Sequence, residues 1–461
     1  MQNNNLPKQA ELSGNHPGGD ADSSPRRPIP GLSSAIERKD MAPPAEEDGL
    51  LPGVGESFTR WLGEGIFSRT PAGALRGVTD ILFFLSFTVC YSWGFINTTM
   101  FKKGFSDAFE LRMEGLLHFA VLNALVCGII AILLQNSLQQ AVFEIVLLAA
   151  GFCHWKFGAG KYEYFVLCVL IVGMTGRSFK MLLSIAFTIG GVIAAAAFVA
   201  SQLGIITDLV YEGGRHSFGI IYCTDCAAHI LYLMVIYVFL RLDSLRLVEY
   251  ISLVLVLALM LLTKAQSDIV CGALLLAGIL VFRFTRRWHK RGFVRVVASI
   301  SSFSFIIFAF VSFAGTFGFN RNDLELRKKI PYSLIRRLEM NQEALSAHPF
   351  SLFGSTIEEH GFGGRTENLP GWDKYFFLDC SYIRLYIIGG ALLFLMILLV
   401  MTYAQLRSFA YGRYDLLFLL MLIAFSCVME HHIMEYYYNV FPLMAFSGRR
   451  LFREDPIPGS G

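Results

Sequence analysis

The stretch YEGGRHSFG, residues 211–219, places an arginine beside a histidine between glycines, where a long apolar run begins. Arg215 stays charged when partly desolvated and can pair bidentately with phosphate oxygens, and His216 is of a type that serves as a general base. An arginine at the edge of an apolar run can equally extend its guanidinium to lipid headgroups. The glycines favour a site, because they allow an irregular turn at membrane depth, which is tolerated only where protein or a water-filled cavity surrounds it.

A second arginine lies inside an apolar run, in FFLDCSYIRLYIIGG (376–390). Asp379 and Tyr382 precede Arg384, which lies about one helical turn into the run. An arginine within the membrane costs about 2.5–3.5 kcal/mol on insertion and indicates a functional role.

Three further segments carry candidate polar residues: two turns where apolar runs end, and one stretch inside a long loop. A solvated turn or an incidental loop residue is the simpler interpretation of each of them. His431 and Glu435 also have the i, i+4 spacing of a helical metal pair, but nothing in the sequence supplies the other ligands, so we expect no metal. The candidates are Lys264 and Asp268 in LTKAQSDIV (262–270), Arg337 and His348 in the stretch 331–354, and Glu430 and His431 in MEHHIMEYYYNVFP (429–442).

If these residues surround one cavity, they suit transfer of a group from a phosphate-bearing substrate to a hydroxyl. The arginines would bind a phosphate-bearing substrate embedded in lipid, and a histidine or carboxylate would act as general base on a hydroxyl. No glycine-rich nucleotide loop occurs in the right context, so the substrate must bring its own leaving group. The predicted catalytic residues are Arg215, His216, His348, Asp379 and Arg384, and the predicted substrate-binding residues are Lys264, Asp268, Arg337, Tyr382, Glu430 and His431.

The elements that must position these residues are membrane helices. The 461 residues are 54% hydrophobic and only 16% charged, and the continuous apolar runs have the length that a bilayer requires of a helix. The sequence therefore predicts an all-α integral membrane protein with about 12 transmembrane helices, ten or eleven being alternatives. The runs are 79–96, 115–134, 139–154, 162–175, 180–203, 217–240, 248–263, 267–283, 296–316, 381–403, 413–429 and 433–447, of which the third and fourth could be a re-entrant pair.

Lysine and arginine in the short loops predict the orientation. The loop RFTRRWHKRGFVR (283–295) should be cytoplasmic, and counting outward places both termini on the same side. One large loop, 317–380, then lies outside between spans 9 and 10, together with Arg215. FKKG (101–104) is the exception to this charge distribution, because it also falls outside.

The remaining segments differ from the membrane domain, which we expect to cover residues 71–450. Residues 1–70 are rich in Pro, Gly and Ser and predict a disordered cytoplasmic tail, and 451–461 predict a cytoplasmic C-terminal tail. Within the large loop, 331–346 predicts an amphipathic helix that lies over a cavity, with Leu334 and Leu338 on its apolar face. The nine cysteines read as small buried hydrophobes, because most lie inside apolar runs.

The motifs RHSFG, LTKAQSDIVCGALLLAGILVF, RLEMNQEAL, FSLFGSTI and LDCSYIRLYIIGG resemble those of Wzy-type polymerases of capsular polysaccharide and O-antigen repeat units. The resemblance covers residues 80–447 in architecture. The chain differs from this family after the seventh span. Many relatives have a serine–arginine there, and this chain has Gln266, Ser267 and Asp268. The chain also has Cys380 at the position before the Ser-Tyr pair, where the family has an asparagine.

The resemblance implies a glycosyltransferase of the cytoplasmic membrane that acts at the outer face. Such an enzyme transfers a glycan from undecaprenyl diphosphate to the next undecaprenyl-diphosphate-linked repeat unit, without metal or cofactor. Its implied partners are the lipid-linked oligosaccharide and membrane lipid, with a chain-length regulator and a flippase of the same capsule system, and no nucleic acid. An O-antigen ligase, which differs mainly in acceptor, and a polysaccharide transporter or flippase remain alternatives, although no two similar halves typical of large transporters are seen.

Overall fold

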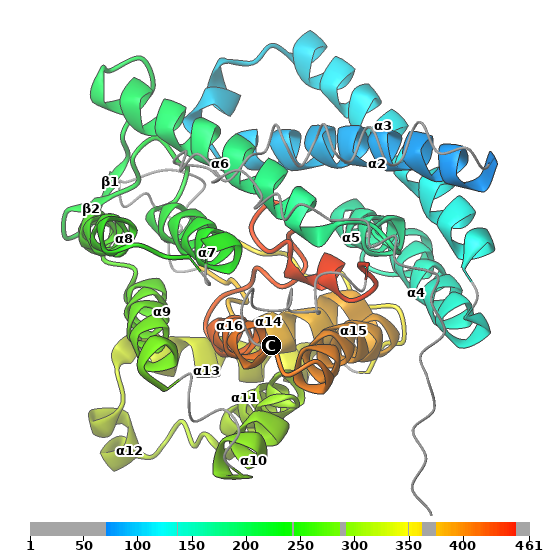
Figure 1. Cartoon of the computed structure of the whole chain (residues 1–461). Coiled ribbons are helices and arrows are strands. Elements are labelled where there is room, and N and C mark those ends of the chain that lie inside the picture. Colours follow the sequence, from blue (N-terminus) through cyan, green and yellow to red (C-terminus); the bar gives the residue numbers. More distant parts are fainter. Residues whose placement is uncertain are drawn as a thin grey trace, which may run out of the picture. The chain divides into compact units, whose positions relative to one another are not determined.

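The computed structural model describes residues 71–135, 137–241, 244–285, 292–348, 350–361 and 375–448. The tails predicted at 1–70 and 451–461 lie outside these residues, as do residues 286–291 of the arginine-rich loop at 283–295. The described residues are overwhelmingly helical (Figure 1). The helices are α2 Pro71–Ile96, α3 Asp107–Leu134, α4 Leu138–Phe157, α5 Tyr162–Gly173, α6 Phe179–Gln202, α7 Cys223–Arg241, α8 Leu247–Met260, α9 Gln266–Thr285, α10 Gly292–Ser301, α11 Ser304–Gly318, α12 Leu324–Lys329, α13 Tyr332–Ala347, α14 Ser381–Arg384, α15 Gly390–Ala410 and α16 Tyr414–Ser426.

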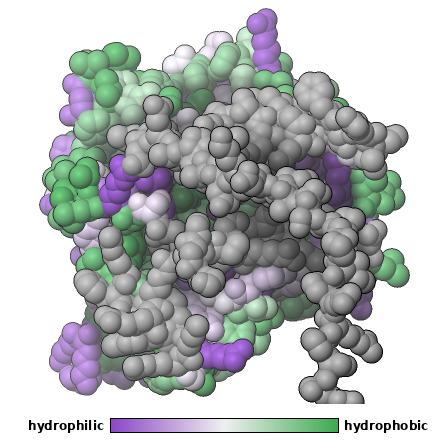
Figure 2. Space-filling model, viewed as in Figure 1, coloured by the Kyte–Doolittle hydropathy of each residue, from purple (hydrophilic) through white to green (hydrophobic). Residues whose placement is uncertain are grey.

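Six of these helices are long and apolar enough to cross a membrane: α2, α3, α4, α6, α7 and the continuous unit α14–α15. The pair α10 and α11 makes a seventh if its 57° bend lies within one span, and α5, α8, α9 and α16 are shorter apolar helices. Hydrophobic side chains are exposed on these helices, as in Leu133 of α3 at 77% and Val248 of α8 at 72%, and Figure 2 shows such residues along much of the visible edge. The prediction of an all-α membrane protein is confirmed at this level.

The first eleven predicted runs each coincide with helical structure, but one of them differs at its start. The predicted span 217–240 begins too early, since α7 starts at Cys223. Phe218 has a φ of 51° and Gly219 a φ of 80°, which a right-handed helix cannot include. Ile220 instead forms an isolated antiparallel bridge with Thr99.

The twelfth predicted run, 433–447, does not form a spanning helix. It is a series of turns that ends in a short 3₁₀ segment, η6 Phe441–Met444. Pro442 has no N–H to donate, and the side chain of Asn439 accepts from the backbone N–H of Phe441 at 3.2 Å. Both features oppose continuous helix despite the apolar composition.

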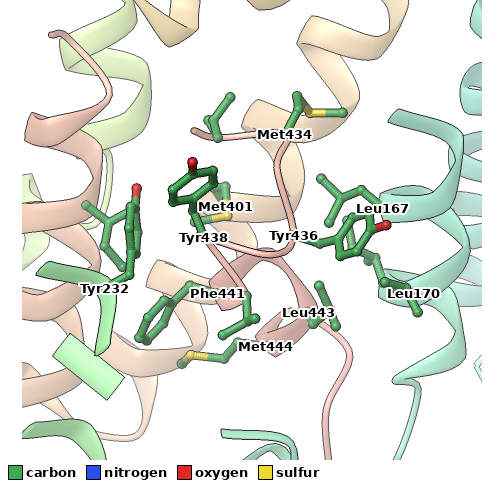
Figure 3. Packing of buried hydrophobic residues seen from close by; sticks show 14 of the residues in the cluster. Leu167, Leu170, Tyr232, Met401, Met434, Tyr436, Tyr438, Phe441, Leu443 and Met444 are labelled. Carbon is green, nitrogen blue, oxygen red and sulfur yellow. The ribbon is translucent and has the colours of Figure 1, made fainter. Parts of the chain in front are cut away.

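This non-helical segment is buried inside protein, which explains how its backbone is satisfied. Tyr436 packs beside Leu167 and Leu170 of α5 (Figure 3). At its end, the N–H of Gly176 donates to the carbonyl of Phe446, and the N–H of Gly448 donates to that of Arg177, both at 2.8 Å. Irregular backbone at membrane depth is tolerated only under such conditions.

The start of the 381–410 unit is irregular as well. A π-type turn, η5 Leu385–Gly389, separates α14 from α15, and Gly390 follows with a φ of 83°. The segment around 351–355 fills the gap, because the N–H of Ser355 donates to the carbonyl of Ile387 at 2.9 Å and that of Ala391 to Ser351 at 3.0 Å. A β carbon at Gly390 would lie only 2.3 Å from the nitrogen of Gly354. The loop predicted as 317–380 is therefore anchored on a membrane helix.

Candidate functional site

A polar cavity of about 610 Å³ lies where several chain segments meet. It is bounded by a hairpin before α7, the first turn of α7, the turn before α9, the first half of α13, the segment 375–379 and the turn after α16. Three cations (Arg215, Lys264 and Arg337) and three carboxylates (Asp225, Asp379 and Glu430) line it, together with Tyr211, Tyr222, Ser267, Tyr375, Phe377 and His431. The cavity, which is referred to below as the polar cavity, thus combines anion-binding and proton-accepting groups.

Arg215 reaches the polar cavity from a two-stranded hairpin, β1 Val210–Tyr211 and β2 Arg215–His216. Gly213 and Gly214 close it with φ values of 77° and 73°, a conformation that L side chains disfavour. The Nε–H of Arg215 donates to the carbonyl of Thr263 at 3.2 Å. The glycines noted in the sequence therefore build the tight turn that holds the arginine.

Lys264 joins the same hairpin to the turn before α9. It has a left-handed φ of 51°, and its Nζ donates to the carbonyl of Gly213 at 2.5 Å. Because both Arg215 and Lys264 line the polar cavity, two positive charges from distant parts of the chain face one space.

Arg337 extends from α13 and pairs with two carboxylates. Its Nε donates to Asp379 Oδ2 at 2.8 Å, and its Nη2 lies 3.8 Å from Glu430 Oε1. Burial alone would lower the pKa of Arg337, but the charges of Asp379 and Glu430 outweigh it and raise that pKa above its ordinary value. Burial raises the pKa of Glu430, although Arg337 opposes the shift. Arg337 is therefore a fixed cation, and Glu430 is a carboxyl group that holds a proton more readily than usual.

Six of the eleven predicted site residues line this cavity, and five do not. His216 lies outside it, because its Nδ1 bonds to Asp208 Oδ2 at 2.7 Å and its ring stacks on Phe218. The backbone N–H of Phe218 donates to the other oxygen of Asp208 at 2.7 Å. This arrangement gives His216 a role in shaping the hairpin.

The other four predicted residues that do not line the polar cavity either make structural contacts or lie away from it. Arg384 forms a buried ion pair with Glu359 and lies 4.8 Å from the ring of Phe377. Tyr382 is fully buried and donates its hydroxyl to the carbonyl of Ala424 at 2.8 Å. Asp268 is buried beside the cavity without lining it, and His348 lies at the C-terminal end of α13. Arg384 is therefore directed at the loop residue Glu359 and does not line the polar cavity.

Comparison of the chain with family models, with curated proteins and with solved structures finds no match to any of them. The site must therefore be interpreted from its own chemistry.

Asp225 is the main site residue that the sequence interpretation missed. It lies in the first turn of α7 and lines the polar cavity, where the hydroxyl of Tyr438 bonds to it. A carboxylate at the start of an apolar run was a usable signal, because ionisable residues in membrane segments are expensive and usually functional. Tyr222 and Tyr375, which also line the cavity, had no such signal, since tyrosine is common at membrane interfaces.

A second cavity of about 460 Å³ adjoins the polar one and is mostly apolar. The two share Gln266, Ser267, Pro331, Ser333 and Arg337 in their lining. The remaining wall comes from α9, α11, α13 and α16 and includes Val270, Val311, Gly315, Leu334, Leu338 and Phe425. This apolar cavity and the polar cavity together offer adjoining sites for the two parts of an amphiphile.

Proposed function

We propose that the protein is a membrane glycosyltransferase that polymerises oligosaccharide repeat units carried on a polyprenyl diphosphate such as undecaprenyl diphosphate. The observation that carries the proposal is the pair of joined cavities. A sugar diphosphate requires cations and hydrogen-bonding groups, and a polyprenyl chain requires an apolar surface. Arg337 belongs to both linings, at the position where the diphosphate would join the lipid.

The cations suit a departing diphosphate. Arg215 and Lys264 come from the hairpin and the turn before α9, and Arg337 comes from α13. Guanidinium groups bind phosphate oxygens bidentately and remain charged. Their interaction strengthens as negative charge develops on the leaving oxygen, so they act on the transition state more than on substrate binding.

The reaction needs one proton acceptor. A hydroxyl oxygen of the acceptor glycan attacks the anomeric carbon of the donor glycan, and the bond from that carbon to the diphosphate oxygen breaks. The polyprenyl diphosphate leaves with the electron pair, and the hydroxyl proton passes to a basic group of the cavity. Asp225 is the proposed acceptor, because it lines the polar cavity and Asp379 is engaged by Arg337.

The orientation inferred from the loop charges puts this site at the outer face of the cytoplasmic membrane. The resemblance to Wzy-type polymerases favours a lipid-linked repeat unit as acceptor. A ligase would use the same cavities with a different acceptor, and the experiment below separates the two.

The test uses the purified full chain in lipid nanodiscs with polyprenyl-diphosphate-linked repeat units. We expect a ladder of glycans in multiples of one unit and release of polyprenyl diphosphate. Transfer of single units to another acceptor without a ladder would replace polymerase by ligase. No released carrier, together with movement of the lipid-linked unit across a bilayer, would overturn the proposal in favour of a transporter. In cells, gene deletion should abolish long surface glycans while single units are still displayed.

A further inference from the structure

The turn after α16 brings three potential metal ligands together. Glu430, His431 and His432 are consecutive, and each offers a donor atom within 4.8 Å of the other two. In a helix, three consecutive side chains would point in different directions. The residues lie instead in a non-helical turn, and so their side chains can converge.

Two ring nitrogens in this group have no hydrogen-bond partner among the residues that the structure describes. They are Nδ1 of His431 and Nε2 of His432. The side chain of His432 is completely buried, so water cannot readily satisfy its nitrogen. A buried polar atom without a partner costs about 1–3 kcal/mol, and such atoms often mark the position of an ion or water.

The opposite nitrogen of His432 is held as it would be in a metal site. Its Nδ1 lies 2.7 Å from Glu435 Oε2. Histidine ligands commonly give their other ring N–H to a carboxylate, which fixes the ring orientation and makes the ligating nitrogen more basic. Glu435 also lies 3.6 Å from Nε2 of His431, so one carboxylate supports both rings.

The charge around these residues also favours a cation. Asp268 is 1% exposed, and its Oδ2 lacks a hydrogen-bond partner within the described part of the chain. Asp268 and Asp225 are both close enough to Glu430 for their charges to interact with it. Arg337 neutralises part of this charge, and because several buried carboxylates share this one guanidinium, a further cation would be stabilised here.

We propose that Glu430, His431 and His432 bind a divalent transition-metal ion of the Zn²⁺ class, with Glu435 orienting the two imidazoles. Two imidazole nitrogens and one carboxylate select zinc-like ions over Mg²⁺ or Ca²⁺. Tetrahedral bonds of about 2.0–2.1 Å would bring the donor atoms to roughly 3.3 Å from one another, a modest closure of the turn. Glu430 and His431 line the polar cavity, so a water or phosphate oxygen can take the fourth position.

This inference is independent of the proposed glycosyl transfer. The ion would neutralise buried carboxylates and fix the non-helical segment after α16. Its binding is measured without any glycan, so a negative result would leave the proposed function standing.

The experiment loads the full chain, purified in detergent with a tag that contains no histidine, with Zn²⁺ or Co²⁺ after chelator treatment. We expect elemental mass spectrometry to detect one Zn²⁺ per chain after desalting. We also expect the Co²⁺-loaded protein to give the absorption spectrum of a tetrahedral site. Both measurements use the wild-type protein. Loss of all Zn²⁺ on desalting, or an octahedral Co²⁺ spectrum, would overturn the proposal.

Variants then assign the ligands. His432→Ala and His431→Ala should each lose the bound ion, and Glu435→Gln should weaken binding by about 10–100-fold. The control is His118→Ala, because His118 lies on the exposed part of α3 and should not affect the metal content. Retention of Zn²⁺ by both ligand variants would contradict the assignment.

Discussion

At the scale of single residues, Arg215 is held in place by backbone structure. The hairpin glycines and the carbonyl of Thr263 hold it at the polar cavity. Its neighbour His216 is engaged by Asp208. The two residues are adjacent in sequence but serve different purposes, which makes them a matched pair for substitution.

We expect Arg215→Ala to lower the polymerisation rate by on the order of 10², because one preorganised charge at the leaving group is removed. Arg215→Lys should recover only part of the rate, since lysine keeps the charge but not the bidentate geometry. The rate is measured with purified protein and lipid-linked repeat units. His216→Ala is the control and should lose less. Near-normal rates in Arg215→Ala would show that the arginine is a headgroup anchor.

Arg384 illustrates the opposite case, a buried arginine with a structural partner. Its ion pair with Glu359 joins the loop to the start of the 381–410 unit, and both side chains are at most 9% exposed. We expect Arg384→Ala to lower the free energy of unfolding by about 3–5 kcal/mol, because Glu359 is left buried and uncompensated. Thermal unfolding in detergent measures the effect.

The control for this prediction is the double variant Glu359→Gln/Arg384→Met, which removes both charges and should be more stable than Arg384→Ala alone. If Arg384→Ala unfolds like the wild type yet makes no polymer, the arginine would instead act on the substrate.

At the scale of elements, α13 has the position that the sequence predicted for an amphipathic helix at 331–346. It begins after Pro331 and ends at Ala347, and it lines both cavities. Its charged residue Arg337 lies between them, while Leu334 and Leu338 face the apolar cavity. The helix therefore separates the proposed sites of the diphosphate and the lipid.

We expect Leu334→Ser/Leu338→Ser to lower polymer yield at normal expression level, because two hydroxyls would replace the apolar wall that receives the lipid chain. The matched control is Leu324→Ser, since Leu324 of α12 is 69% exposed and lines neither cavity. Gel analysis of the glycan, normalised to protein amount, gives the result. Equal yields from the double variant and the control would mean that the apolar cavity does not hold substrate.

At the scale of the whole molecule, the sidedness of the membrane domain decides which substrates can reach the cavities. The short loops rich in arginine predict that residues 283–295 are cytoplasmic and that 317–380 lies outside. In a background without native cysteines, Glu343→Cys should react with an impermeant thiol reagent added to intact cells, and His289→Cys should be protected. The reverse pattern would put the polar cavity on the cytoplasmic side and remove the basis for an outward-facing polymerase.

The sequence by itself determined most of the membrane helices and several residues of the site. Eleven apolar runs coincide with helical segments. The length and hydrophobicity of a run are local properties of the sequence, and they determine whether a helix suits the hydrocarbon core of a bilayer. Arg215 and Lys264 were identified for a similar reason, since a charge next to an apolar run is conspicuous in sequence alone.

Only the tertiary structure decided which polar groups share a space. Arg384 is as conspicuous in sequence as Arg215, yet it pairs with Glu359, a partner 25 positions earlier in the chain. Glu430, His431 and His432 converge because the last apolar run folds as turns against α5 and α15, although its composition suits a helix. Such outcomes depend on which buried partners satisfy each backbone and side-chain polar group, and those partners are set by long-range packing that no local pattern contains.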